Sequence, residues 1–199
     1  VGGINHKYFK YDQAKQGARQ VGSTFKPFVY VTAMEQLHKS PCDSIIDASF
    51  TIPRGKWGVS QDWTPKNSTG NFIGATTLDK ALAQSINTIS AKLMDMVGPK
   101  AVVDMTKKLG VNADIPEQVA ISLGAVDISV HDMVAAYSTF ANMGVYIKPQ
   151  TILRIEDKNG KVLYEHVPEP KDVLSKDVSY AAIKLLEGVT RGGSGARLR

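Results

Sequence analysis

The chain has 199 residues, of which 43% are hydrophobic and 22% are charged, a composition typical of one globular domain or a large part of one. The net charge of +5 is mildly basic, but no run of Lys and Arg exceeds a pair and aromatic residues do not alternate with them. A nucleic-acid partner is therefore not expected. Cys42 is the single cysteine, which excludes an intrachain disulfide and a zinc cage made of cysteines. No apolar run approaches the roughly 20 residues that a membrane-spanning helix needs.

The two ends of the chain favour a segment cut from a longer protein. It begins at Val1-Gly2-Gly3 without an initiator methionine, and no signal peptide follows. Residues 191–195 are rich in glycine, which is typical of a flexible linker.

The first predicted helix follows Ser23. Apolar residues recur at helical spacing over residues 25–38. Pro27 fits only in the first turn of a helix, so the helix begins near Thr24 and Ser23 lies at its N-terminus. Residues 40–76 hold prolines, glycines, asparagines and both tryptophans, which predicts a long irregular connection with short strands at residues 44–52.

Further helices follow after residue 76. Thr76 or Thr77 can cap the next helix, and Gly98 is a natural C-terminal stop. Ser129 with Asp132 three residues later resembles a capping box. The predicted helices span residues 25–38, 78–84, 88–98, 99–109, 129–144 and 175–189.

One β-hairpin is predicted near residues 151–166. Residues 151–156 and 161–166 alternate like strands, and Asn159-Gly160 between them is a strong turn signal. Five or six helices against one hairpin indicate an α+β fold dominated by helix, with a reduced sheet.

Ser23 and Lys26 form the first candidate for chemistry. Residues three apart on a helix share a face, so the lysine amine can reach the serine hydroxyl. A serine needs a base to become a nucleophile, and a lysine serves when burial lowers its pKa. The N–H groups at a helix N-terminus can stabilise an oxyanion. Spacing alone leaves open a capping serine beside a solvated lysine.

Ser85 and Asn87 form a second candidate, because Ser85-Ile86-Asn87 interrupts an otherwise continuous helical pattern. Asparagine and serine are poor residues for a helix interior. At a helix junction the two side chains would point toward one cleft, where a hydroxyl could relay a proton and the amide could hold a carbonyl or a lysine. The alternative is a solvent-facing pair on an exposed helix.

The sequence resembles the transpeptidase domain of class A, bifunctional penicillin-binding proteins. Their nucleophile helix is similar to residues 19–34, RQVGSTFKPFVYVTAM. Residues 63–93 resemble the segment that leads into their Ser-x-Asn motif, and residues 122–165 resemble the helix and hairpin that follow. Ser-x-x-Lys is the nucleophile motif of penicillin-binding proteins and serine β-lactamases. The resemblance covers nearly the whole chain.

The resemblance implies a role for each residue of the two motifs. Ser23 would be the acylated nucleophile, Lys26 its general base and Ser85 the proton shuttle to the leaving amine. Asn87 would contact the peptide donor and the lysine. The implied reaction is cross-linking of peptidoglycan stem peptides outside the cytoplasmic membrane, with β-lactams acylating the same serine. It implies no metal or organic cofactor, and membrane contact only through an anchor in a parent chain.

Two departures from the family pattern qualify this resemblance. Val21 stands where the family has proline, and no Lys-Thr-Gly or Lys-Ser-Gly triplet exists in the sequence. Residues 1–199 are therefore expected to form a partial transpeptidase domain that lacks flanking sheet strands at both ends and is acylated slowly. Two alternatives remain: a catalytically silent helical scaffold, or a hydrolase of the D,D-carboxypeptidase or β-lactamase type.

Several other polar and aromatic residues favour structural roles. The four histidines have no spacing typical of a metal site. Asp43 and Asp47, in a stretch rich in Pro and Ser, are expected to be turn or cap residues. Trp57 and Trp63 could line a substrate groove, but packing beneath the 40–76 connection is favoured.

Overall fold

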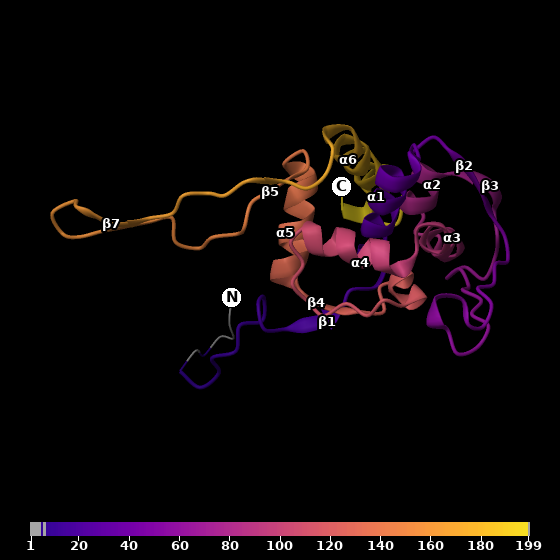
Figure 1. Ribbon diagram of the computed structural model, residues 1–199, viewed down its shortest axis with the longest axis horizontal. Helices are drawn as coiled ribbons and strands as arrows, with labels where there is room; N and C mark the ends of the chain where they lie inside the picture. The colour runs from indigo at the N-terminus through magenta and orange to yellow at the C-terminus, as the bar shows by residue number, and fades with distance from the viewer. Residues whose placement is uncertain (1–4, 6, 199) are drawn as a thin grey trace.

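The computed structural model describes residue 5 and residues 7–198. Its helices gather into one body around α1 (Lys26–Leu37), as Figure 1 shows. Nine consecutive residues of α1, Lys26 to Met34, are buried, as expected for a helix that is covered on every side. Helix α1 contacts α3 (Asn87–Val97), α4 (Pro99–Lys108) and α6 (Lys176–Arg191). The core of the protein therefore surrounds the helix that begins at the Ser-x-x-Lys motif.

All the predicted helices form within the described residues. The others are α2 (Leu78–Ala83) and α5 (Val130–Ala141), and short 3₁₀ helices occur at η1 (Gly22–Phe25), η2 (Lys56–Gly58), η3 (Val119–Leu123) and η4 (Ala196–Leu198). Ser129 caps α5, since its hydroxyl accepts a hydrogen bond from the Asp132 N–H at 3.1 Å. The carboxylate of Asp132 instead accepts from the Asn112 N–H at 3.0 Å, so only half of the predicted capping box forms.

Within residues 7–198, the strands pair into four separate antiparallel ladders of two strands each, which confirms an α+β fold dominated by helix with a reduced sheet. The predicted hairpin is β6 (Arg154–Glu156) with β7 (Val162–Glu165). The other three ladders join strands far apart in the sequence and have no local turn signal. They are β1 (Ala18–Gln20) with β4 (Asp127–Ser129), β2 (Ser44–Asp47) with β3 (Gly74–Thr77), and β5 (Val145–Tyr146) with β8 (Lys171–Asp172).

The β6–β7 hairpin extends away from the helical body (Figure 1), and the residues of both strands are exposed. Its loop is one residue longer than the predicted Asn159-Gly160 turn. The Asp157 N–H donates to the Lys161 carbonyl at 2.9 Å, which leaves three residues between the paired positions. Gly160 has a φ of +81°, as expected in a three-residue hairpin loop that ends in a left-handed residue.

The 40–76 connection is a structured excursion closed by the β2–β3 ladder. Ile52 and Trp63 exchange two backbone hydrogen bonds of 2.9 Å across its middle. Trp63 is partly buried and packs against the core, as predicted. Trp57 is 41% exposed, and its indole N–H donates to the Asp95 carboxylate at 2.9 Å.

Residues 191–195 differ from the flexible linker that their composition predicts. The Ser194 N–H donates to the carbonyl of Ala83 at the end of α2, at 2.8 Å. Gly193 packs so closely on Ala83 that a side chain there would collide with its carbonyl oxygen. Among the described residues, no helix combines the length and the apolar character that crossing a membrane requires.

Candidate active site

The Lys26 side chain lies at the centre of the candidate site. Its ammonium nitrogen lies 2.6 Å from the Ser85 carbonyl oxygen, 2.9 Å from Ser85 Oγ and 2.7 Å from Asn87 Oδ1. Lys26 is 1% exposed, although it occupies the first position of α1. The structure therefore brings three of the four residues selected from the sequence into one hydrogen-bonded cluster, which we call the Lys26 cluster.

The cluster can hold Lys26 in either charge state. As an ammonium, Lys26 donates to all three oxygens. As a neutral amine, it donates to the Ser85 carbonyl and to Asn87, while its lone pair accepts from the Ser85 hydroxyl, whose hydrogen is free to rotate. Burial lowers the pKa of Lys26 from 10.5 to about 8, because desolvation penalises the charged form. A base with this pKa is partly neutral near neutral pH, where it can accept a proton.

A break between two helices places Ser85 and Asn87. Helix α2 ends at Ala83 and α3 begins at Asn87, as the interrupted pattern predicted. Ser85 has a φ of +57°, a left-handed conformation that is unfavourable for a residue with a Cβ. This conformation directs both the carbonyl and the hydroxyl of Ser85 at Lys26. Backbone strain of this kind is concentrated at functional sites.

Ser23 lies three residues before Lys26, in the η1 turn that leads into α1. It is exposed, whereas Phe25 and Lys26 after it are buried. Among the described residues, the hydroxyl of Ser23 has no hydrogen-bond partner, so the predicted direct bond to Lys26 is not formed. The hydroxyl faces solvent at the N-terminal end of a buried helix, which is favourable for attack on an incoming carbonyl.

Asn67 and Asp47 are structural members of this region, although the sequence suggested no role in the site for either of them. Asp47 is 1% exposed and accepts hydrogen bonds from Asn67 and Thr88 side chains and from the Ile73 N–H. It is therefore not the turn or cap residue that its Pro/Ser-rich surroundings predicted. Asp43 does lie in a turn, where its N–H donates to Ser40. No regular spacing links residues 47, 67 and 88, so the sequence offered no signal for this network.

Two glycines hold the η1 turn in place. The Gly22 N–H donates to the Gly124 carbonyl at 3.1 Å, next to the β1–β4 ladder. Gly124 has a φ of +77°, and a Cβ there would lie 1.8 Å from the Gly22 carbonyl oxygen. A side chain at position 124 would therefore displace the residue immediately before Ser23.

We expect Gly124→Ala to lower the free energy of unfolding by at least about 3 kcal/mol, because it adds a backbone collision to an unfavourable φ. Gly160→Ala is the matched control, since Gly160 has a φ of +81° but no atom near its missing Cβ. That control should cost only about 1–2 kcal/mol. Urea denaturation measures both, and equal losses would contradict the close approach of Gly124 to Gly22.

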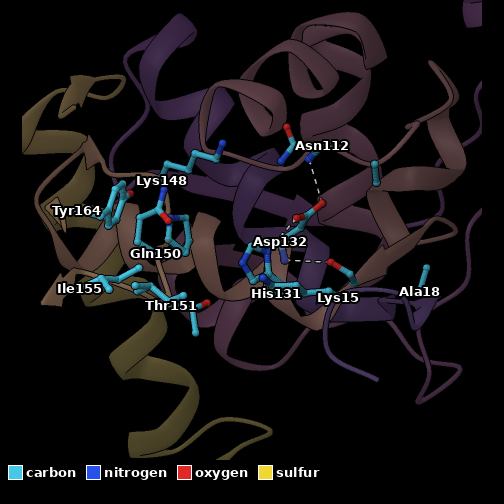
Figure 2. A pocket seen from close by; sticks show the side chains of 14 residues that line it. Lys15, Ala18, Asn112, His131, Asp132, Lys148, Gln150, Thr151, Ile155 and Tyr164 are labelled. Carbon is cyan, nitrogen blue, oxygen red and sulfur yellow. Dashed lines mark hydrogen bonds and ion pairs between the residues drawn. The ribbon is translucent and has the colours of Figure 1, made fainter. Parts of the chain in front are cut away.

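A hollow of about 850 Å³ lies apart from the Lys26 cluster. Figure 2 shows it between the start of α5 and the base of the β6–β7 hairpin, with Lys15, His131 and Lys148 on its walls. Its one carboxylate, Asp132, is already bonded to the Asn112 N–H. Among the described residues, the hydroxyls of Ser129 and Thr151 on its walls are not bonded to a lysine or histidine, so its chemistry is less specific than that of the Lys26 cluster.

The cluster has the parts needed for serine acyl transfer. An exposed serine begins a helix, and a buried lysine of lowered pKa is bonded to a second serine. Within the described part of the chain, no three His, Cys, Asp or Glu residues are grouped as metal ligands. Because Lys26 and Ser85 are hydrogen-bonded to each other, a proton can pass between them.

Comparison with known proteins places this chain in a family. The model of the penicillin binding protein transpeptidase domain matches residues 5–199. Penicillin-binding protein 1A of Aquifex aeolicus (strain VF5) is 37% identical over 197 residues, which cover 99% of this chain and 27% of that protein. The penicillin-binding protein 1A of Pseudomonas aeruginosa is 31% identical over 169 residues, 84% of this chain and 20% of that protein. The chain thus spans about a quarter of the length of the curated relatives it matches.

Solved structures agree with this placement. The crystal structure of penicillin-binding protein 1A from Haemophilus influenzae superimposes with a TM-score of 0.88 at 25% identity, over 100% of this chain and 35% of that one. PonA1 of Mycobacterium tuberculosis in complex with penicillin V gives a TM-score of 0.76 at 26% identity, over 92% of this chain and 50% of that one. With the family model matched over nearly all residues, this chain belongs to the penicillin-binding protein transpeptidase domain family and is homologous to penicillin-binding protein 1A.

Proposed function

We propose that residues 1–199 are part of an acyl-serine D,D-transpeptidase domain that cross-links peptidoglycan and is acylated by β-lactams at Ser23. The observation that carries the proposal is the buried Lys26, whose pKa is lowered to about 8 and whose amine is bonded to Ser85 and Asn87. Membership in the transpeptidase family and the penicillin V complex of the PonA1 homologue support it.

In the proposed acylation, Ser23 Oγ bonds to the carbonyl carbon of the penultimate D-Ala of a stem peptide. Neutral Lys26 takes the hydroxyl proton. The Ser23 N–H is proposed to face the oxyanion that forms, since the Gly22 and Thr24 N–H groups already donate to backbone carbonyls. The proton then passes through the Ser85 hydroxyl to the departing D-Ala nitrogen as the C–N bond breaks. The short bond between Lys26 and Ser85 makes this relay possible without moving either side chain far.

In the proposed second half-reaction, an amine on a neighbouring strand attacks the ester. A new C–N bond forms, the ester C–O bond breaks, and the proton that the attacking amine loses passes through Lys26 to Ser23 Oγ. A β-lactam enters at the first step, where its ring amide opens and leaves an ester on Ser23. Asn87 is proposed to contact the peptide donor with the second N–H of its amide, because the first donates to the Lys66 carbonyl at 2.8 Å.

The proposed reaction also implies a cellular location and binding partners for this chain. Stem peptides lie outside the cytoplasmic membrane, so we propose an extracytoplasmic location, with any membrane contact made by an anchor in a parent chain. We propose peptidoglycan stem peptides and β-lactams as partners. The reaction proposed here needs neither nucleic acid nor a metal or organic cofactor, since the proton transfers use side chains alone.

Covalent labelling tests the proposal. The chain is incubated for hours with a fluorescent penicillin, digested, and the labelled peptide is identified by mass spectrometry. We expect one adduct, on the peptide that contains Ser23, and slow labelling, because the sequence has no Lys-Thr-Gly or Lys-Ser-Gly triplet to supply a further oxyanion donor. Loss of one such donor costs about 10²–10³ in rate in a serine protease. An adduct elsewhere, or none, would contradict the proposal.

Product analysis separates transfer from hydrolysis. With a stem-peptide donor and an amine acceptor, a transpeptidase forms the amide product, while a D,D-carboxypeptidase or β-lactamase gives the acyl group to water. The exposed position of Ser23 admits either acceptor. A chain that acts only as a helical scaffold would form no acyl-enzyme at all.

A further inference from the structure

We propose that Asp47 is a positioning residue of this site, acting through Asn67 and Thr88 to fix the oxygen of Asn87 that Lys26 binds. The inference rests on the proposed function for the role of Lys26 in the reaction. The structural basis of the proposal is a chain of hydrogen bonds that runs from the end of β2 to the Lys26 cluster.

Asp47 is placed to act as an acceptor only. It is the last residue of β2 and is 1% exposed. The Asn67 amide donates to its two carboxylate oxygens at 3.0 and 3.1 Å, the Ile73 N–H donates at 2.9 Å, and the Thr88 hydroxyl donates to Oδ1. A buried carboxylate with several donors is stable as an anion. Burial raises the pKa of Asp47, but the bonds from Thr88, Ile73 and Asn67 and the charge of Lys92 outweigh it and leave the pKa lowered.

Asn67 carries the effect of Asp47 to the start of α3. With its amide nitrogen held by Asp47, its Oδ1 accepts from the Asn87 N–H at 3.0 Å and from the Thr88 N–H at 3.1 Å. These are two of the N–H groups that a helix N-terminus leaves unpaired. Ile86, the residue at the N-cap position of α3, supplies no side-chain cap. A residue 20 positions earlier in the chain therefore caps this helix.

The capped end of α3 carries the Asn87 side chain. Its Oδ1 accepts from Lys26 at 2.7 Å, and its Nδ2 donates to the Lys66 carbonyl, one residue before Asn67. The same short segment thus holds both the backbone and the amide of Asn87. If Asp47 no longer orients Asn67, the backbone N–H groups at the start of α3 lose their aligned acceptor, and the Asn87 oxygen is held less firmly against Lys26.

Thr88 offers the sharpest test, because two substitutions distinguish the effect of its hydroxyl group from the effect of its side-chain volume. Thr88→Val removes the donor to Asp47 and keeps the volume, while Thr88→Ser restores a hydroxyl. Thr106→Val is the matched control: Thr106 is equally buried, and its hydroxyl bonds only to the Val102 carbonyl on α4. Asp47→Asn is the second variant. It replaces one carboxylate oxygen, which accepts, with an amide NH₂ group, which donates, next to the three groups that donate to Asp47.

The first measurement follows the titration of Lys26 by lysine side-chain NMR in each full-length variant. An ammonium that loses a hydrogen-bond acceptor is less favoured, so Thr88→Val and Asp47→Asn should titrate lower than the wild type by roughly half a unit to one unit. Thr88→Ser and Thr106→Val should match the wild type. A Lys26 titration that is unchanged in Thr88→Val, with the variant folded, would overturn the proposal.

The second measurement is the rate of acylation by fluorescent penicillin at saturating concentration. We expect Thr88→Val to be slowed at least about 10-fold with an unchanged affinity before acylation, and Thr88→Ser to recover the rate. Equal rates for Thr88→Val and Thr106→Val would overturn the inference. Failure of the wild type to be labelled would contradict the proposed function instead, and the Lys26 titration would still decide the role of Asp47.

Discussion

Replacement of Ser23 by alanine is expected to abolish covalent labelling by penicillin. The side chain is exposed and makes no hydrogen bond among the described residues, so its removal should leave the fold intact. The variant still contains the Lys26 cluster, but it has no oxygen at the position where the acyl group would attach. Labelling should fall below detection over the hours that suffice for the wild type, while the thermal unfolding midpoint stays within about 2 °C.

Ser60→Ala is the matched control for this experiment. Ser60 is also an exposed serine outside the helices, but it lies in the 40–76 connection. Its variant should be labelled at the wild-type rate. Retained labelling in Ser23→Ala would mean that another residue is the nucleophile, and the proposed reaction would then be wrong.

Replacement of Lys26 by methionine is expected to slow acylation by about 10²–10⁴-fold, the range typical of a lost general base. Methionine keeps the length and most of the volume of the lysine stem but cannot accept a proton. In the wild type, the rate should rise with pH to a plateau with a midpoint near the lowered pKa of about 8. The variant should show no such rise, and stopped-flow labelling from pH 6 to 9.5 measures both.

The same lysine should give the folded protein a distinctive dependence of stability on pH. Its pKa is about 8 in the folded protein against 10.5 for an ordinary lysine. Between these values the unfolded chain binds more protons, so the free energy of unfolding rises with pH across this window and is lowest below about pH 8. A difference of about 2.5 units corresponds to about 3 kcal/mol.

The comparison with Lys26→Met isolates this contribution, since buried tyrosines are common to both proteins and cancel. Urea denaturation at several pH values should show the wild type gaining stability relative to the variant as the pH rises. A constant difference across the window would mean that Lys26 has an ordinary pKa, and its proposed role as the base would lose its physical support.

The sequence contained local signals for most of the helical frame and for the centre of the site. Pro27 fixed the start of the helix after Ser23, and Asn159-Gly160 marked the hairpin. The pair Ser85 and Asn87 was found because serine and asparagine are unfavourable inside a helix, and the structure places a break there. Each of these signals depends on residues that are close together in the sequence, because local backbone preferences determine where a helix or a turn begins and ends.

The residues that hold the site in place from outside the Lys26 cluster had no local signal in the sequence. Asp47, Asn67 and Thr88 come from three segments separated by 20 and 21 residues, and nothing in their spacing indicates contact. The strand β2 lies within the short strands expected at residues 44–52, but the pairing of β1 with β4, β2 with β3 and β5 with β8 was not predicted, since these partners meet only after the helices pack. Burial also decided the pKa of Lys26, and a solvated lysine at the same sequence position would have an ordinary value.

The sequence separations within the Lys26 cluster also determine when it can form. Its bonds join residues 59 and 61 positions apart, and Asp47 to Thr88 spans 41, whereas each helix closes bonds only four apart. Loop-closure entropy delays contacts of large separation in folding. The helices can therefore exist before the cluster does, and a partly folded chain could hold most of its helical content while Lys26 remains a solvated and fully protonated amine.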